Sequence, residues 1–279
     1  MTYDQAITTG AARLKSTSDS PALDSEVLLT FACKVSREKI LTHPEIRLTG
    51  NQARIFLRLI KQRRSGIPVA YLTGKKNFFG RDFAVTKDVL VPRPETEGLV
   101  ELALKEIHAC PRVLTILDLG TGSGCIAVTL KLAGEKKTML TATDISIKAL
   151  AVARKNSLTY KTKIKFVKSD LFSKLSSKFD LIVSNPPYVP FSEYRKNFMQ
   201  LKKEPRLALT DKSNDFRLFN KLIPGIAEHL REKGVALLEI HPKMKTNNRL
   251  ISLAKKSRLS CKFFKDLSGK WRYLRLEKI

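Results

Sequence analysis

Four residues in the second half of the chain, Asn185-Pro186-Pro187-Tyr188, have the types and spacing of an amide-binding pocket. They follow the apolar run 179–184, which predicts a buried strand. Proline has a fixed φ and no N–H group, so the carbonyl oxygens here and the Asn185 side chain remain available to a ligand, beside an aromatic ring. Such acceptors suit a planar NH2 group. The alternative interpretation is a rigid turn that ends a strand.

A second motif, Gly120-Thr121-Gly122-Ser123-Gly124, joins a short apolar strand over residues 115–119 to an apolar helical pattern that begins at Cys125. Glycines allow a tight turn and let backbone N–H groups approach a ligand closely. The spacing differs from the dinucleotide fingerprint, and the Lys-Ser/Thr pair of a phosphate-binding loop is missing. The turn therefore predicts a nucleotide-type cofactor that need not carry phosphate.

Two acidic residues follow the next two predicted strands. Asp144 ends a strand over residues 139–144, 20 residues after Gly124, close to the spacing at which a carboxylate binds ribose hydroxyls in doubly wound folds. Asp170 ends a third strand that begins at Ile164, where the edge of an adenine would lie. Each acid could instead cap the following helix. The prediction of a cofactor site rests on the combination of the four strand ends rather than on any one of them.

The order of these strand ends resembles the class I S-adenosylmethionine-dependent methyltransferases that modify exocyclic or amide nitrogens. The resemblance implies that the glycine loop holds the methionine end of the cofactor, Asp144 the ribose, and Asp170 with Leu171 the adenine. It also implies that the Asn185 oxygen and the Pro186 carbonyl accept the two N–H bonds of the substrate amide, and that Tyr188 packs against the amide plane. The implied cofactor-binding residues are Gly120, Thr121, Gly122, Ser123, Gly124, Asp144, Asp170, Leu171 and Asn185. The implied catalytic residues are Asn185, Pro186 and Tyr188, and Pro187 joins them in the substrate site.

Length and composition predict a soluble protein of one or two domains, with 279 residues of which 43% are hydrophobic. No apolar run approaches the length of a membrane span, and the N-terminus lacks the basic flank and apolar core of a signal peptide. The four cysteines and four histidines are scattered singly, which favours neither a disulfide framework nor a metal site. We therefore expect a cytoplasmic protein that uses no metal.

The formal net charge of +26 is the one unusual feature of the composition. A field of this sign attracts polyanions, and nucleic-acid affinity that depends strongly on salt is expected from it. The alternative is a general lysine bias, because the charge is spread along the chain without a basic arm. Distributed charge predicts incidental nucleic-acid binding and says little about specific recognition.

The hydrophobic periodicity predicts helices in the first part of the chain, among them one that starts at Pro21, one over residues 37–42 and one over residues 51–64. Alternation and turn glycines over residues 71–85 predict a β-hairpin. From about Val113 strands alternate with helical patterns, which predicts a mostly parallel sheet with helices on both faces. The chain should close with a central strand at 235–240 and an antiparallel pair at 261–266 and 272–276.

Taken over nearly its whole length, the chain is similar to the release-factor glutamine N5-methyltransferase family (HemK/PrmC type). The resemblance implies a class I, Rossmann-like α/β domain with a seven-stranded, mostly parallel sheet over residues 111–279. It also implies an N-terminal helical substrate-recognition domain over residues 1–72, with a β-hairpin linker and connecting helix over residues 73–110. The implied reaction is methylation of the Gly-Gly-Gln glutamine of peptide-chain release factors. The motifs that carry the resemblance are Pro68-Val69-Ala70-Tyr71-Leu72-Thr73-Gly74, Val91-Pro92-Arg93-Pro94-Glu95-Thr96-Glu97, the glycine loop, Asn185 to Tyr188, and Glu204-Pro205-Arg206-Leu207-Ala208-Leu209.

Three segments depart from the family pattern. Residues 211–216 replace a Gly-Gly-x-Asp-Gly loop, residues 241–244 replace the end of a Glu-Ile-Gly-x-x-Gln segment, and Leu171 stands where a Trp often flanks the adenine. Three alternatives also stay open at this point: a glutamine methyltransferase for a ribosomal protein, a DNA or RNA amino-methyltransferase that acts on a flipped base, and a diverged cofactor-binding protein without activity.

Overall fold

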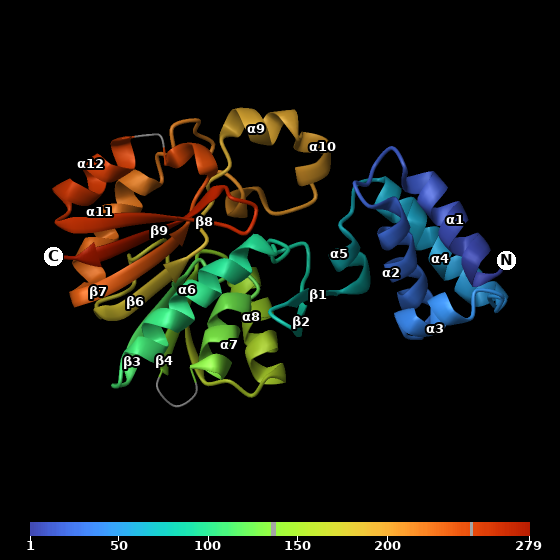
Figure 1. Ribbon diagram of the computed structural model, residues 1–279, viewed down its shortest axis with the longest axis horizontal. Coiled ribbons are helices and arrows are strands. Elements are labelled where there is room, and N and C mark those ends of the chain that lie inside the picture. Colours follow the sequence, from blue (N-terminus) through green and yellow to red (C-terminus); the bar gives the residue numbers. More distant parts are fainter. Residues whose placement is uncertain (135–137, 246–247) are drawn as a thin grey trace. The chain divides into compact units, whose positions relative to one another are not determined.

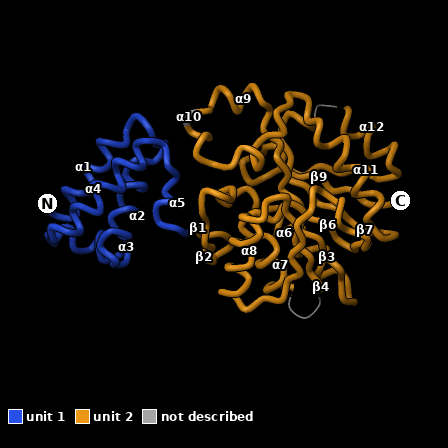
Figure 2. Tube along the Cα trace, turned by 180° about the vertical axis from the view of Figure 1, so that it is seen from behind, with its two compact units in different colours: residues 1–75 blue, residues 76–279 orange. Residues whose placement is uncertain are grey.

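A computed structural model describes residues 1–134, 138–245 and 248–279, which form two compact units, residues 1–75 and 76–279 (Figure 2). The first unit is a bundle of short helices. Buried apolar side chains from its helices, among them Leu28, Phe56 and Ile60, form its own core. Its elements are α1 (Tyr3–Leu14), α2 (Pro21–Cys33), α3 (Arg37–Thr42), α4 (Gly50–Arg64) and α5 (Val69–Thr73).

Local sequence explains where these helices begin. Thr2 and Thr49 each accept the backbone N–H three residues on, and the glutamine at that position bonds back to the threonine N–H, so α1 and α4 both start with a capping box. Ser36 caps α3 by accepting the N–H of Lys39. Pro21 occupies the first turn of α2, where a missing N–H costs nothing.

The second unit is built on a seven-stranded sheet with the order β5-β4-β3-β6-β7-β9-β8. Strands β3 to β7 run parallel, whereas β9 is antiparallel to both β7 and β8. The chain adds β4 and β5 on one side of β3 and then returns to place β6 on the other side, which makes a topological switch point beside β3. The strands are β3 (Leu114–Leu119), β4 (Thr138–Asp144), β5 (Ile164–Lys168), β6 (Phe179–Ser184), β7 (Leu230–Glu239), β8 (Leu259–Lys265) and β9 (Trp271–Lys278).

Helices cover both faces of this sheet (Figure 1). One layer consists of α6 (Glu95–Ala109), α7 (Cys125–Ala133) and α8 (Ile147–Thr159), and the other of α11 (Phe219–His229) and α12 (Asn248–Lys256). A hairpin of β1 (Lys75–Phe78) and β2 (Arg81–Ala84) precedes α6, and the short helices α9 (Phe191–Lys196) and α10 (Phe198–Leu201) follow β6.

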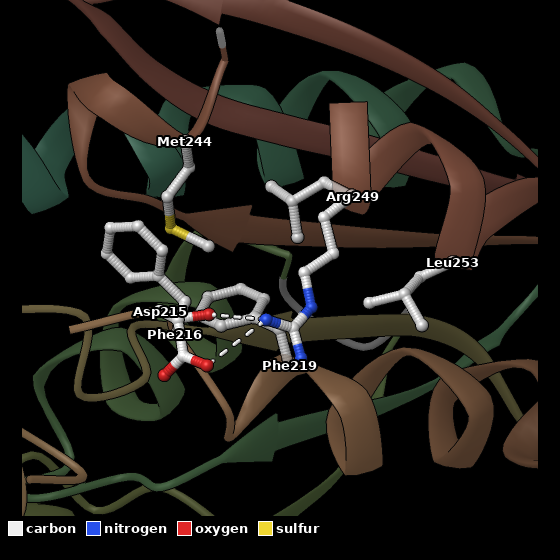
Figure 3. Close-up of a pocket in the computed structure, with 7 residues that line it drawn as sticks. Asp215, Phe216, Phe219, Met244, Arg249 and Leu253 are labelled. Atoms are coloured by element: carbon white, nitrogen blue, oxygen red, sulfur yellow. Dashed lines mark hydrogen bonds and ion pairs between the residues drawn. The ribbon is translucent and has the colours of Figure 1, made fainter. Parts of the chain in front are cut away.

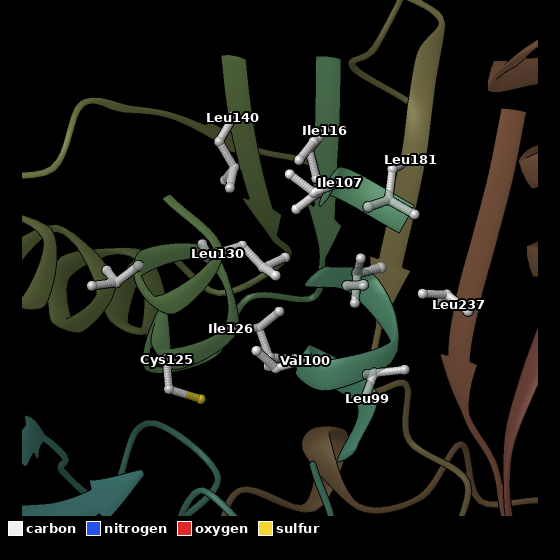
Figure 4. Packing of buried hydrophobic residues seen from close by; sticks show 14 of the residues in the cluster. Leu99, Val100, Ile107, Ile116, Cys125, Ile126, Leu130, Leu140, Leu181 and Leu237 are labelled. Carbon is white, nitrogen blue, oxygen red and sulfur yellow. The ribbon is translucent and has the colours of Figure 1, made fainter. Parts of the chain in front are cut away.

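The alternation of side chains along the strands supplies both cores. Ile116 and Leu181 point to one face, where they meet Leu99 of α6 and Ile126 of α7 (Figure 4). Their neighbours Leu117 and Ile182 point to the other face and pack beneath α11. Because both faces are buried, the central strands are predominantly apolar, and the predicted mostly parallel sheet is confirmed.

Several boundaries differ from the sequence-based expectation; for example, β7 begins at Leu230 rather than at Val235, and two other differences have a clear local cause. Residues 71–73 belong to helix α5, and the hairpin starts only after Gly74, which adopts a left-handed φ of +73° and ends the helix. Strand β5 ends at Lys168 rather than at Asp170. The hydroxyl of Ser169 donates to the Leu171 carbonyl and accepts the N–H of Lys174, and these bonds turn the chain away from the sheet.

Candidate active site

The glycine loop after β3 adopts a conformation that only glycine accepts without strain. Gly120, Gly122 and Gly124 have φ values of +77°, +55° and +80°. A Cβ at Gly124 would lie 3.0 Å from the Ala153 side chain, so this glycine allows α8 to approach the loop. At Gly120 and Gly122 a Cβ would meet open space.

Most N–H groups of the loop donate hydrogen bonds within the fold. Gly120 and Thr121 both donate to the Thr143 carbonyl, Gly122 donates to the Asp144 carboxylate, and Gly124 donates to the Thr121 carbonyl. A loop used in this way has no ring of free donors for a phosphate. The geometry agrees with the absence of the phosphate-loop lysine from the sequence.

Asp118 supports the loop from beneath. Its Oδ2 atom accepts the Thr121 hydroxyl at 2.6 Å and the Ala127 N–H at 3.2 Å. The side chain is completely buried, and this burial raises the pKa of the carboxyl to about 7. Asp118 therefore fixes the turn from within the fold.

Asp144 has two attachments at the end of β4. Its carboxylate accepts the N–H of Gly122 at 2.9 Å and the N–H of Ser146 at 2.8 Å, and burial raises its pKa. Ile145, which follows Asp144, is 50% exposed and lines the pocket described below, as Asp144 does. An exposed isoleucine at this point offers an apolar face to a planar ring, and sequence reasoning missed it although it directly follows the predicted ribose ligand.

These residues open onto one pocket of about 700 Å³, within the usual size range of small-molecule sites. The pocket brings together most of the residues predicted from sequence: Gly120, Thr121, Gly122, Ser123, Asp144, Asp170, Leu171, Asn185, Pro186 and Pro187. Asp170 is exposed and Leu171 is half-buried. Two predicted residues do not line it, because Gly124 packs against α8 and Tyr188 turns toward the interior.

A hydrogen-bonded row of side chains leads from two pocket residues, Asn185 and Thr96, to the buried side chains of Glu239 and Tyr188. The Asn185 Nδ2 atom donates to the Thr96 hydroxyl at 3.0 Å, and that hydroxyl donates to Glu239 Oε2 at 2.7 Å. The Tyr188 hydroxyl donates to Glu239 Oε1 at 2.6 Å. Burial raises the pKa of both Glu239 and Tyr188, and the neighbouring Arg272 opposes this effect only in part.

A second contact joins two motifs that are far apart in the sequence. Arg93 of the Pro-Arg-Pro-Glu segment forms an ion pair with Glu204 at 2.5 Å, and Glu204 also accepts the Val91 N–H at 3.0 Å. Glu204 is almost completely buried, and Arg93 and Glu204 both line the pocket. The ion pair holds the segment after β6 against the segment before α6.

Comparisons with known proteins identify the family. Residues 5–74 match the PrmC N-terminal domain, and residues 100–203 match the Methyltransferase small domain. The chain is 40% identical to a release factor glutamine methyltransferase of Koribacter versatilis over 86% of both chains. It is 38% identical to one of Leptospira interrogans, over 91% of this chain and 90% of the relative.

The chain belongs to the release factor glutamine methyltransferase family. It is a methyltransferase that depends on S-adenosylmethionine. Its fold is also similar to the crystal structure of a methyltransferase from Pyrococcus furiosus, with a TM-score of 0.53, 22% identity, and coverage of 72% of this chain and 91% of that one. This likeness agrees with the class I sheet described above.

Two of the departures from the family pattern contact each other. The Phe216 ring lies 6.0 Å from the ring of His241, which in turn lies 6.4 Å from the Tyr188 ring. The loop around Phe216 is held by Asp211, whose carboxylate accepts the N–H groups of Ser213 and Leu218. The altered loop is therefore fixed by its own side chains.

Figure 3 shows the second anchor of this loop, where the Arg249 guanidinium contacts Asp215 beside Phe216 and Met244. The cavity between these side chains is about 10 Å³, which is room for one water molecule. It is too small for a substrate group, so the large pocket remains the candidate active site.

Two further findings concern residues 1–134, 138–245 and 248–279 only. Within them no cluster of three or more His, Cys, Asp or Glu side chains could hold a metal ion. None of their helices is both long and apolar enough to cross a membrane.

Proposed function

We propose that the chain transfers a methyl group from S-adenosylmethionine to the side-chain amide nitrogen of the glutamine in the Gly-Gly-Gln motif of peptide-chain release factors. The observation that carries this proposal is the pocket itself. The glycine loop and Asp144 share it with Asn185 and Pro186, which are acceptors suited to an NH2 group. The release factor as substrate follows the names of the relatives.

On the cofactor side, the open space at Gly120 and Gly122 suits the methionine end, and Asp144 suits a diol. Asp170, Leu171 and the exposed Ile145 surround the place proposed for the adenine. S-adenosylmethionine would supply an electrophilic methyl group on a sulfonium. The residues fit such a ligand, because the N–H groups of Gly120, Thr121, Gly122 and Gly124 are already bonded within the fold and S-adenosylmethionine has no phosphate to bind, and because the pocket volume is sufficient.

On the substrate side, the amide nitrogen is a weak nucleophile because its lone pair is delocalised into the carbonyl. Asn185 Oδ1 and the Pro186 carbonyl would accept the two N–H bonds and favour partial pyramidalisation of the nitrogen. Tyr188 would act from behind this wall, since its hydroxyl is bonded to Glu239. Pro187 would complete the wall without adding a competing N–H donor.

We further propose that residues 1–72 recognise the protein substrate, that residues 73–110 connect this segment to the methyltransferase domain over residues 111–279, and that the enzyme works in the cytoplasm. The match of residues 5–74 to the PrmC N-terminal domain supports the first point. Release factors act in translation, which supports the last.

A methyl-transfer assay tests the proposal. The enzyme is given tritiated S-adenosylmethionine together with a release factor, the same factor with Gly-Gly-Gln changed to Gly-Gly-Ala, a ribosomal protein preparation, or RNA and DNA. Label should appear on the intact release factor only, and mass spectrometry should place it on the glutamine. Label on a ribosomal protein or on a nucleobase, with the release factor unmodified, would support the corresponding alternative.

A further inference from the structure

Thr96 and Glu239 are almost completely buried and are joined by hydrogen bonds to Asn185 in the pocket wall. Thr96 lies in the first turn of α6, Glu239 at the end of β7 and Asn185 just after β6, so three separate elements meet at one row of hydrogen bonds. We propose that Thr96 and Glu239 are positioning residues that fix which atom of the Asn185 amide faces the substrate. This inference rests on the proposed function, in which Asn185 Oδ1 accepts a hydrogen bond.

With the Glu239 carboxyl ionised, the form in which it accepts from both neighbouring hydroxyls, the donors and acceptors along the row permit one arrangement. An ionised carboxylate has no proton to donate, so both hydroxyls that contact Glu239 must donate to it. Tyr188 does so at 2.6 Å and Thr96 at 2.7 Å. Thr96 has one proton and has given it to Glu239, so its oxygen can only accept from Asn185.

The orientation of the Asn185 amide follows from this. Its NH2 group faces the Thr96 hydroxyl at 3.0 Å, and its carbonyl oxygen is left for the pocket that Asn185 lines. The flipped amide would place two oxygen atoms 3.0 Å apart with no proton between them, and would present a donor to the NH2 group of the substrate. The row therefore disfavours the flipped Asn185 amide, in which the NH2 group rather than the oxygen would face the substrate.

Burial protects the row from competing water. Glu239 is 0% exposed and Thr96 is 3% exposed. Glu239 lies opposite Tyr273 in the antiparallel pair of β7 and β9, and the Tyr273 hydroxyl donates to the Glu95 carbonyl next to Thr96. Strands β7 and β9 thus hold both partners of the hydrogen bond between Thr96 and Glu239.

The first test removes the Thr96 hydroxyl at constant shape. Thr96→Val should lower kcat for release-factor methylation by roughly 10-fold to 100-fold, by analogy with the hydrogen-bond partners that orient metal ligands. The KM for the release factor and the affinity for S-adenosylhomocysteine should change by less than about threefold. Thr96→Ser keeps the hydroxyl and should restore kcat to within about threefold of the wild type.

Thr129→Val is the matched control. Thr129 is also completely buried, and its hydroxyl finds no hydrogen-bond partner among the described residues. The same substitution there should leave kcat unchanged. Glu239→Gln tests the other end, because a glutamine has only one oxygen for the two hydroxyls, and kcat should fall as in Thr96→Val.

The last measurement needs no substrate and so separates this inference from the proposed function. In enzyme labelled with 15N-asparagine, Thr96→Val should shift the side-chain NH2 signals of Asn185 and speed their exchange with water, while Thr129→Val should not. The inference is overturned if Thr96→Val leaves these signals unchanged or keeps more than half of the wild-type kcat. If the wild type does not methylate a release factor but the signals respond as described, the proposed function fails and the positioning role stands.

Discussion

The segment just after β6 has few free hydrogen-bond donors, which leaves mainly acceptors near the pocket. Pro186 and Pro187 have no N–H group, and the Asn185 NH2 group is occupied by Thr96. The groups left for a ligand are oxygen atoms, Asn185 Oδ1 and the Pro186 carbonyl. Such acceptors suit an NH2 group whose nitrogen lone pair attacks an electrophile. In the proposed function, the two prolines would thus have a chemical role beyond ending a strand.

Removing the Asn185 acceptor should abolish turnover but spare most of the cofactor affinity. The contact strengthens as the amide nitrogen becomes pyramidal, so it acts mainly in the transition state. Asn185→Ala should therefore lower kcat by much more than tenfold, measured by tritiated-methyl transfer beside calorimetry of S-adenosylhomocysteine binding. A variant that retained over a tenth of the wild-type kcat, a barrier change below roughly 1.4 kcal/mol, would exclude Asn185 from the catalytic centre.

Asp144 is expected to bind the ribose and also to hold the glycine loop through Gly122. Charge-assisted hydrogen bonds contribute on the order of 1.5 to 3 kcal/mol each, so Asp144→Ala should weaken S-adenosylmethionine binding by at least about tenfold. Calorimetry gives the affinity, and circular dichroism checks that the fold is retained. Unchanged affinity in a folded variant would remove Asp144 from the site.

At the scale of elements, the sequence predicted those features that depend on neighbours in the chain. Largely apolar runs bounded by glycine, acid or proline marked β3, β4 and β6, because strands buried on both faces are mostly apolar. The same local reasoning misassigned residues 71–73. Their alternating pattern resembles a strand, but Pro68 and Gly74 bound a single helical turn.

Contacts between distant segments could not be predicted in this way. Thr96 and Glu239 are separated by 143 positions, and Arg93 and Glu204 by 111. Each residue type is compatible with a solvated surface, and only the closed sheet brings the partners together. Sequence reasoning placed Arg93 and Thr96 in a motif of the family without giving either a partner, and it did not assign Glu239 any role.

Asp180, at the start of β6, shows how one such contact stabilises the sheet. Its carboxylate accepts Arg112 at 2.7 Å and both the N–H and the hydroxyl of Thr115. Burial alone would raise its pKa, but these hydrogen bonds outweigh burial and lower the pKa to about 2. The folded state therefore binds this proton more weakly than the unfolded chain does.

This shift predicts a pH-dependent loss of stability in Asp180→Asn. A depressed carboxyl pKa stabilises the fold above the unfolded value near 4, and the contribution disappears as pH falls through about 2. The free energy of unfolding in urea should be lower in the variant by about 2 kcal/mol at pH 7, and by about half as much at pH 3. The exposed Asp19→Asn serves as the control for loss of one charge. A difference that does not change with pH would contradict this account.

At the scale of the whole molecule, the net charge of +26 and the pocket interact with ligands over different distances and with different sensitivity to salt. Long-range attraction acts on any polyanion and is screened within about 10 Å at 0.1 M salt. In the proposed function, the pocket would act at hydrogen-bond distance on one NH2 group, an interaction that salt screens much less. Salt should therefore separate charge-driven binding from methyl transfer.

Nucleic-acid binding should collapse between low and physiological salt while release-factor methylation persists. Each phosphate contact adds about 0.9 to the slope of log affinity against log salt, so six to ten contacts would cost roughly 10³-fold to 10⁵-fold between 50 and 200 mM. Fluorescence anisotropy with labelled RNA measures the binding, and mass spectrometry of the release factor at the same salt concentrations measures the reaction. If methylation of the glutamine declined in parallel with RNA binding, the charge would have to contribute to substrate capture, and the pocket alone could not account for specificity.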